Sequence, residues 1–208
     1  MNFETIVWKL YDIANWIMRL IYLNLLWIFF SLLGLGIFGV FPSTAAMFSI
    51  SRKWLFRETD IPLTKTFFNY FKKNFIQMNK IGIAMIIIGI ILYVDLKFFQ
   101  ASEHIISSIL SYVMIFALII YFASILYLFP IYVHFKFKTF EYIKQSIIAS
   151  LGKPLITIMM FSASYLLYRL FIFLPIVLMF FVGSLSSIVT MWIAMRIFPT
   201  SDYLIDEK

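Results

Sequence analysis

Long apolar runs alternate with short polar stretches along the whole chain. A helix that crosses a hydrocarbon layer about 30 Å thick needs about 20 mostly apolar residues. Runs that approach this length lie at about 10–34, 81–97, 105–133, 154–174 and 175–198. The pattern therefore predicts an all-α polytopic transmembrane helical bundle, in which residues 1–208 form a single integral membrane domain.

The number of crossings depends on a less apolar run at 42–57. A glycine-rich stretch, Gly34–Pro42, is expected to break the helix before it, because glycine and proline both disfavour a helix interior. Ser43 or Thr44 can then cap a new helix. We therefore expect a separate helix over about residues 42–57.

Two topologies are open for this helix. If it is a cytosolic extension, the chain has five spans. If the glycine-rich stretch is an outer turn, the helix returns through the membrane and the chain has about six spans. We favour six, because Arg19 and Lys53 then lie at the same face, at the ends of hairpin arms of about 22 Å and 17 Å.

Two basic amphipathic helices are predicted between the spans, at about 63–80 and 138–152. Each has an apolar stripe opposite lysine residues, which is typical of helices that lie on a membrane surface or dock on a partner. The segments Lys65–Ile76 and Lys138–Ile148 also resemble each other. We interpret them as parts of an internal repeat, in which a surface helix leads into a helical hairpin.

The distribution of basic residues predicts the orientation. In the arrangement with about six spans, only Lys97 and Arg169 of the 17 Lys and Arg lie on the outer side. Basic loops stay on the cytoplasmic side, so both termini are expected there. The net charge of +7 then reflects loops beside anionic lipid, and we expect the lipid bilayer and no nucleic acid as a partner.

Residues that carry catalysis are scarce. The chain has no Cys and two His, and His104 and His134 are predicted on opposite faces, where they cannot share a metal. Metalloprotease, paired-carboxylate and phosphate-loop patterns are absent from the sequence. We therefore expect no enzyme activity, no cofactor and no metal site.

Three polar residues fall within or near predicted spans and are candidates for an intramembrane role. Asn24 is expected to hydrogen-bond to a neighbouring helix. Asp95 and Arg169 are predicted near the outer ends of different spans, where they could pair and line a solute path. Alternatively, each extends separately to the outer interface.

Several short motifs resemble a known family. They are Asn24-Leu-Leu-Trp27, Pro42-Ser43-Thr44-Ala45-Ala46 after the glycine-rich stretch, Arg52-Lys53, and Phe67-Phe68-x-x-Phe71-Lys72-x-Asn74-Phe75. The sequence resembles the YesL family of bacterial integral membrane proteins, over nearly the whole chain but with its motifs between residues 24 and 80. Family members often carry a Gly-Glu-Asp turn where this chain has Arg57-Glu58-Thr59-Asp60, which leaves the role of the turn open.

This resemblance implies a function rather than a mechanism. Genes of the family commonly lie beside sugar ABC importers, so it implies a non-catalytic accessory subunit of a carbohydrate uptake system in the bacterial cytoplasmic membrane. ABC permease or ATPase subunits would be the partners. The candidate contact surface is formed by Arg52, Lys53, Lys65, Lys72, Lys73, Lys138 and Lys144. The alternatives are a small secondary transporter or channel, and a membrane sensor or assembly factor.

Overall fold

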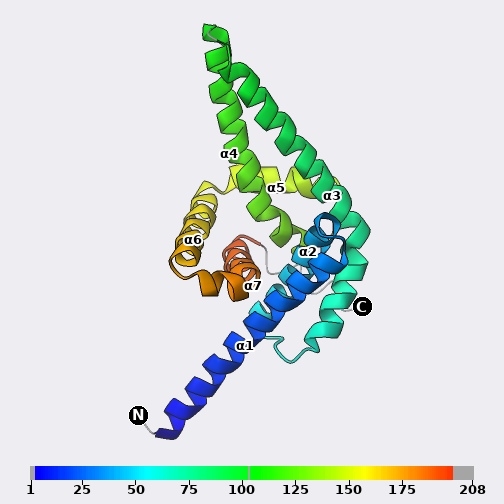
Figure 1. Cartoon of the computed structure of the whole chain (residues 1–208), viewed down its shortest axis with the longest axis vertical. Helices are drawn as coiled ribbons and strands as arrows, with labels where there is room; N and C mark the ends of the chain where they lie inside the picture. Colours follow the sequence, from blue (N-terminus) through cyan, green and yellow to red (C-terminus); the bar gives the residue numbers. More distant parts are fainter. Residues whose placement is uncertain (1–2, 103, 199–208) are drawn as a thin grey trace.

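The computed structural model describes residues 3–102 and 104–198, and its elements there are all α-helices (Figure 1). The helices are α1 (Phe3–Leu33), α2 (Ile37–Leu55), α3 (Leu63–Gln100), α4 (Ile105–His134), α5 (Glu141–Gly152), α6 (Pro154–Phe173) and α7 (Pro175–Ala194). By length and composition, α1, α3, α4 and α6 can cross a membrane, and α7 contains a shorter apolar segment, Met179–Ala194. The all-α class is confirmed, and the helices are those of a multi-pass membrane protein.

The hairpin of α1 and α2 differs from its prediction at the turn. Helix α2 begins at Ile37 rather than after Pro42, and Pro42 lies buried inside it. The turn is short, with Gly36 at a φ of 68°. A Cβ added to Gly39 would lie 2.2 Å from the carbonyl oxygen of Ser31. Gly39 therefore lets the backbones of α1 and α2 approach closely. It does not break α2, as the glycine-rich stretch was predicted to do.

Helix α3 joins two elements that the sequence pattern separates. The predicted surface helix at 63–80 and the predicted span at 81–97 form one helix of 38 residues. This helix is continuous and bends part-way along its length (Figure 1). Phe67 and Met78 of the first half are fully buried. The apolar stripe thus packs against α1 and α2, while the lysine residues on the opposite face stay exposed. That residues 63–80 lie along a membrane surface or dock on a partner stays a prediction.

The second unit of the predicted repeat is built differently from the first. A separate short helix, α5, covers 141–152 of the expected 138–152. Pro154 then begins α6, because proline has no amide hydrogen and is tolerated in a first helical turn. Helix α6 ends at Phe173, and Pro175 likewise begins α7. The predicted spans at 154–174 and 175–198 therefore correspond to real helices.

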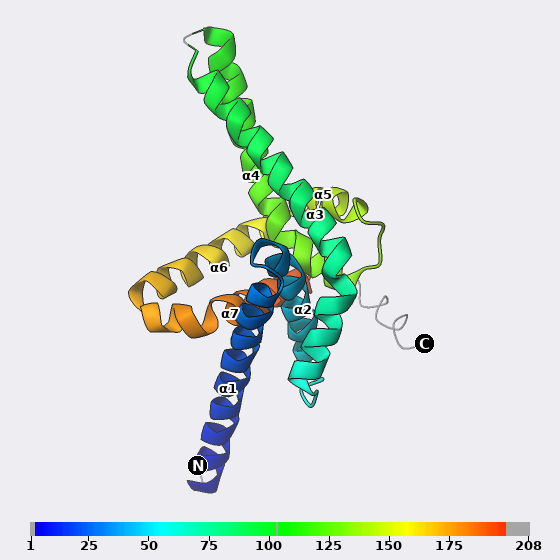
Figure 2. The ribbon, with the colours of Figure 1, turned by 45° about the vertical axis from the view of Figure 1, so that its right-hand side comes forward.

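Helix α2 lies at the centre of the fold. It packs against α1, α3, α4 and α7. The α3–α4 and α6–α7 hairpins project from this centre in different directions (Figure 2). In the apolar windows of α3, α4 and α6, only 17% of the residues are buried. These two hairpins thus leave most of their apolar side chains for lipid or another protein to cover.

Candidate functional site

The side chain of Asn24 is one of the fully buried polar groups at the centre of the fold. Its exposure is 0%, its Nδ2 donates to the carbonyl oxygen of Met179 at 3.0 Å, and its Oδ1 accepts from the amide of Gly183 at 2.9 Å. These two α7 groups are four positions apart, the spacing of an ordinary helical hydrogen bond. The side-chain amide of Asn24 therefore bonds to a backbone carbonyl and a backbone amide that lie one turn apart on α7.

The close approach of three helices at this point depends on Gly183. A Cβ there would lie 3.0 Å from the Oδ1 of Asn24 and 3.1 Å from the Sδ of Met47. One turn further along α7, Ser187 shares a buried hydrogen bond of 2.8 Å with Ser51 of α2. The Gly183-x-x-x-Ser187 pattern thus joins α1, α2 and α7. We use the name α7 junction for five residues: Asn24, Met47, Ser51, Gly183 and Ser187.

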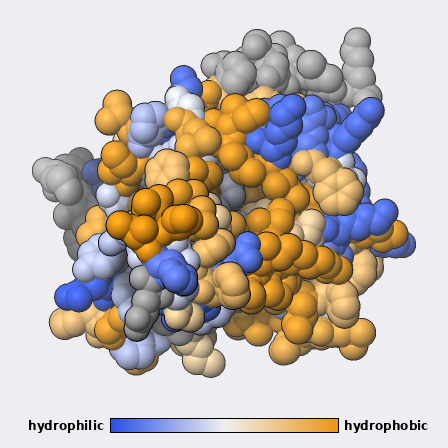
Figure 3. All heavy atoms as spheres, turned by 90° about the horizontal axis from the view of Figure 1, so that it is seen from above, coloured by the Kyte–Doolittle hydropathy of each residue, from blue (hydrophilic) through white to orange (hydrophobic). Residues whose placement is uncertain are grey.

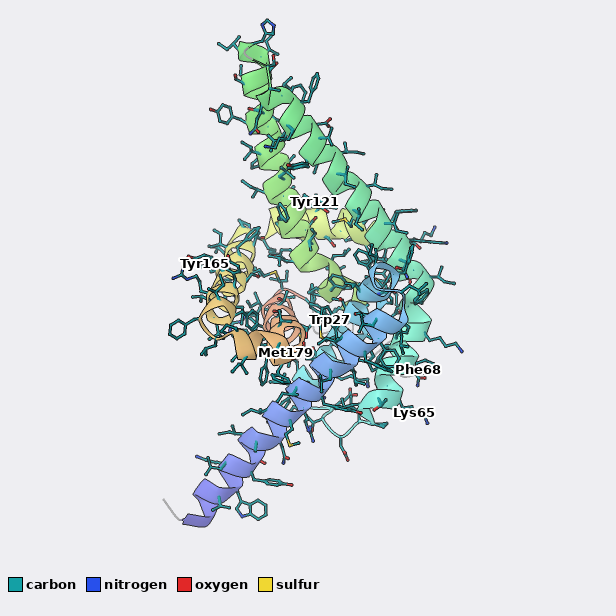
Figure 4. The ribbon with its side chains drawn as sticks, viewed as in Figure 1. Trp27, Lys65, Phe68, Tyr121, Tyr165 and Met179 are labelled. Carbon is teal, nitrogen blue, oxygen red and sulfur yellow. The ribbon has the colours of Figure 1, made fainter. Side chains whose placement is uncertain are left out.

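A second polar contact joins α1 to α2 beside this junction. The indole Nε1 of Trp27 donates to the hydroxyl of Thr44 at 3.0 Å, and that hydroxyl donates to the carbonyl oxygen of Val40 at 2.7 Å. Figure 4 shows Trp27 near Met179 at the centre of the molecule. Ser43 or Thr44 was predicted to cap a helix, but both lie inside α2, and Thr44 bridges two helices.

The open end of the α1–α2 hairpin is tied to the turn that precedes α3. The guanidinium of Arg19 donates to the carbonyl oxygen of Thr59 at 2.9 Å. Lys53 forms an ion pair with Glu58. The Arg57-Glu58-Thr59-Asp60 turn, whose role the resemblance left open, therefore fixes the end of α2 to α1.

The predicted cationic contact surface is spread over three elements. Lys65, Lys72 and Lys73 are exposed on α3, Lys138 precedes α5 and Lys144 lies on it, both also exposed. Arg52 and Lys53, at the end of α2, are half-buried. In Figure 3, hydrophilic residues gather on the right, the side on which α3 lies in Figure 1.

The structure does not bring Asp95 and Arg169 together. Asp95 is half-buried in the α3–α4 hairpin, whereas Arg169 is exposed on α6. Among the described residues, α3 and α6 share no contact. The hypothesis that this pair lines a solute path thus loses its geometric basis. His104 and His134 also lie far apart, at opposite ends of the 30-residue α4.

A groove between α6 and α7 was not anticipated from the sequence. Ser164 and Tyr168 from α6, and Ser186 and Thr190 from α7, are among the residues that line a groove of about 310 Å³, whose surface is mainly apolar. Its other lining residues are apolar. Each pair is spaced four positions apart, so its members share a helix face. This spacing is the signal that could have revealed the groove.

Comparison with known proteins places the chain in a family. Residues 20–96 match a family described as "Protein of unknown function, DUF624", and this region holds the last part of α1, all of α2 and most of α3. The chain is 38% identical to uncharacterized protein YteU of Bacillus subtilis (strain 168) over 174 residues, which are 84% of this chain and 78% of YteU. It is 33% identical to uncharacterized protein YesL of the same organism, over 91% of this chain and 89% of YesL.

The chain belongs to the YesL family. Uncharacterized protein YesV of Bacillus subtilis (strain 168) is a further relative, 33% identical over 95% of both chains. No solved structure matches this YesL-family protein. Three residues of the α7 junction, Asn24, Met47 and Ser51, lie in the segment that matches the family, whereas Gly183 and Ser187 lie outside it.

Proposed function

We propose that this YesL-family protein is a non-catalytic accessory subunit of a bacterial carbohydrate ABC uptake system. It would lie in the cytoplasmic membrane with both termini on the cytoplasmic side. The observation that carries the proposal is the groove on the α6–α7 hairpin, which four hydroxyl-bearing residues help to line. Around it the hairpin exposes large side chains, such as Tyr165 and Leu166 on α6, which are 59% and 67% exposed.

Hydroxyls in such a groove favour a protein neighbour over lipid. Acyl chains offer no hydrogen-bond partner to Ser186 or Thr190, whereas the backbone and side chains of another membrane helix do. Small and hydroxyl-bearing residues also allow helices to approach closely. A transmembrane helix of an importer's permease is therefore the partner that we expect at this groove.

The cationic surface has a separate role in this proposal. The exposed Lys65, Lys72, Lys73, Lys138 and Lys144 lie on α3 and around α5, not on the α6–α7 hairpin. Lysines of this kind are attracted to anionic headgroups and to acidic surfaces of cytosolic subunits. We expect them to orient the protein and to contact the ATPase subunit, while the groove binds the permease.

The test is co-purification from native membranes in mild detergent, with mass spectrometry of the captured proteins. The wild-type protein should capture ABC permease subunits in stoichiometric amounts. Ser186→Leu, which removes a groove hydroxyl and fills space, should lose them. Ser108→Leu, the same change at an exposed position of α4, should retain them and serves as the control. A wild-type protein that purifies alone or only as a homo-oligomer would refute the proposal.

A further inference from the structure

Helix α5 has apolar residues on its exposed face as well as on its buried face. The face that packs on α4 buries Tyr142, Ile143, Ser146 and Ser150. The opposite face exposes four large apolar side chains, those of Phe140, Ile147, Ile148 and Leu151. A helix face that meets water normally carries polar and charged residues. The exposed face of α5 therefore has the composition of a surface that something other than water covers.

A single lysine lies in the middle of this exposed face. Lys144 is separated by four positions from both Phe140 and Ile148, so the three side chains lie on one side of the helix. With Ile143 and Ile147 they line an open hollow of about 440 Å³. Among the described residues, the Lys144 ammonium has no hydrogen-bond or ion-pair partner. The hollow thus suits a ligand that joins an anionic group to apolar chains.

The order of the helices along the chain places α5 close to the membrane surface. It lies between α4 and α6, both of which can cross a membrane by length and composition. Residues 135–140 join α4 to α5, and Lys153 alone joins α5 to α6. Helix α5 also packs against both neighbours (Figures 1 and 2). Because these connections are short, α5 stays near the bilayer surface at which α4 ends and α6 begins.

The surroundings of this face favour a lipid over a protein as its occupant. The exposed apolar surface continues from α5 onto α6, where Leu155 and Ile158 are 77% and 60% exposed. Residues 135–160 contain one acidic residue, Glu141, and four lysines, which are Lys136, Lys138, Lys144 and Lys153. Acyl chains cover apolar side chains of an interfacial helix, and anionic headgroups attract the lysines beside them. A phospholipid with an anionic headgroup supplies both parts in one molecule.

We propose that the exposed face of α5 binds a phospholipid with an anionic headgroup. The ammonium of Lys144 pairs with the headgroup phosphate, since lysine extends its charged end toward the interface while its stem lies along apolar surface. Phe140, Ile147 and Ile148 contact the acyl chains. Of the exposed lysines, Lys144 then orients the protein on the bilayer, and those of α3 are left for the ATPase subunit. The lipid site itself does not depend on the proposed importer.

Native mass spectrometry of the purified full-length protein tests the site. The protein in mild detergent is titrated with phosphatidylglycerol or with phosphatidylcholine. Lys144→Gln should weaken binding of the first phosphatidylglycerol about fivefold, the effect of one lysine at an anionic surface, and leave phosphatidylcholine binding unchanged. Lys72→Gln, the same change at an exposed position of α3, is the control and should bind as the wild type does. Equal losses in the two variants, or no loss in Lys144→Gln, would overturn the proposal.

A second measurement distinguishes lipid from protein or water at this face. The chain has no native Cys, so Ile148→Cys can carry a single bimane fluorophore. The labelled protein is placed in nanodiscs that contain only this protein, phosphatidylcholine and phosphatidylglycerol. A spin label at the headgroup end of the acyl chain should quench the fluorophore more strongly than a label at the methyl end. Absent or equal quenching, or stronger quenching by the methyl-end label, would contradict the inference.

Discussion

Replacing Asn24 tests the α7 junction most directly. In Asn24→Ala, both hydrogen bonds between the side-chain amide of residue 24 and the backbone of α7 are lost. Hydrogen bonds between membrane helices average about 0.6 kcal/mol each, so the two contribute about 1 kcal/mol. The small cavity left at this fully buried position adds to this, which gives an expected loss of about 1–2 kcal/mol.

The isosteric Asn24→Asp should destabilise more than Asn24→Ala. A carboxylate can accept from the Gly183 amide, but it cannot donate to the Met179 carbonyl, and it adds a charge inside the protein's apolar centre. On insertion scales a carboxylate at the centre of a span costs about 2.5–3.5 kcal/mol. The order of stability should therefore be wild type, then Asn24→Ala, then Asn24→Asp.

The assay is reversible unfolding in mixed micelles with increasing dodecyl sulfate, followed by circular dichroism. Leu25→Ala is the matched control, since Leu25 follows Asn24 on the same helix and is 46% exposed. Its free energy of unfolding should stay close to the wild-type value. Two results would show that the side-chain amide of Asn24 does not hold α1 and α7 together. In one, Asn24→Ala and Leu25→Ala unfold at the same fraction of dodecyl sulfate. In the other, Asn24→Asp is as stable as the wild type.

Three further contacts give predictions for the same assay. Gly89→Ala should destabilise by about 1–3 kcal/mol, because a Cβ would lie 2.6 Å from the Tyr121 hydroxyl, and Tyr121→Phe should relieve part of that loss. Ser51→Ala and Ser187→Ala should be less than additive in a double-mutant cycle, with a coupling of about 0.6 kcal/mol, and additive losses would contradict the shared hydrogen bond. Phe30→Ala should cost about 3–5 kcal/mol, since Phe30 is 7% exposed and stacks on a buried ring, and a loss below 1 kcal/mol would refute its core role.

The first and last residues of a helix were predicted closely where the sequence contains clear helix-start or helix-stop residues. The predicted spans at 105–133 and 154–174 correspond to α4 and α6 within about one residue at each end. Pro154 and Pro175 each begin a helix, since proline lacks an amide hydrogen and favours the first helical turn, although the sequence marked the turn at Pro175 only weakly. A helix start at Pro42 was also predicted, but this prediction is wrong, because α2 begins at Ile37 and contains Pro42 in its interior.

The candidate site was predictable only in part. Asn24 could be picked out as a polar residue in an apolar run, and a neighbouring helix could be expected as its partner. Its actual partners, Met179 and Gly183, lie more than 150 positions away, and nothing local indicates which helix turns toward Asn24. Whether Asp95 pairs with Arg169 was left open for the same reason, since the pattern places residues along a span but not around it.

The sequence by itself determined that this chain is a helical membrane protein, since composition and run length depend only on the transfer of side chains from water to lipid. It also determined the apolar stripe of residues 63–80. Only the tertiary structure decided what that stripe covers, because a stripe of given width can face lipid, a partner or another helix of the same chain. The buried Phe67 settles that choice in favour of α1 and α2. Contacts of this kind arise between segments distant in sequence, where local propensity carries no information.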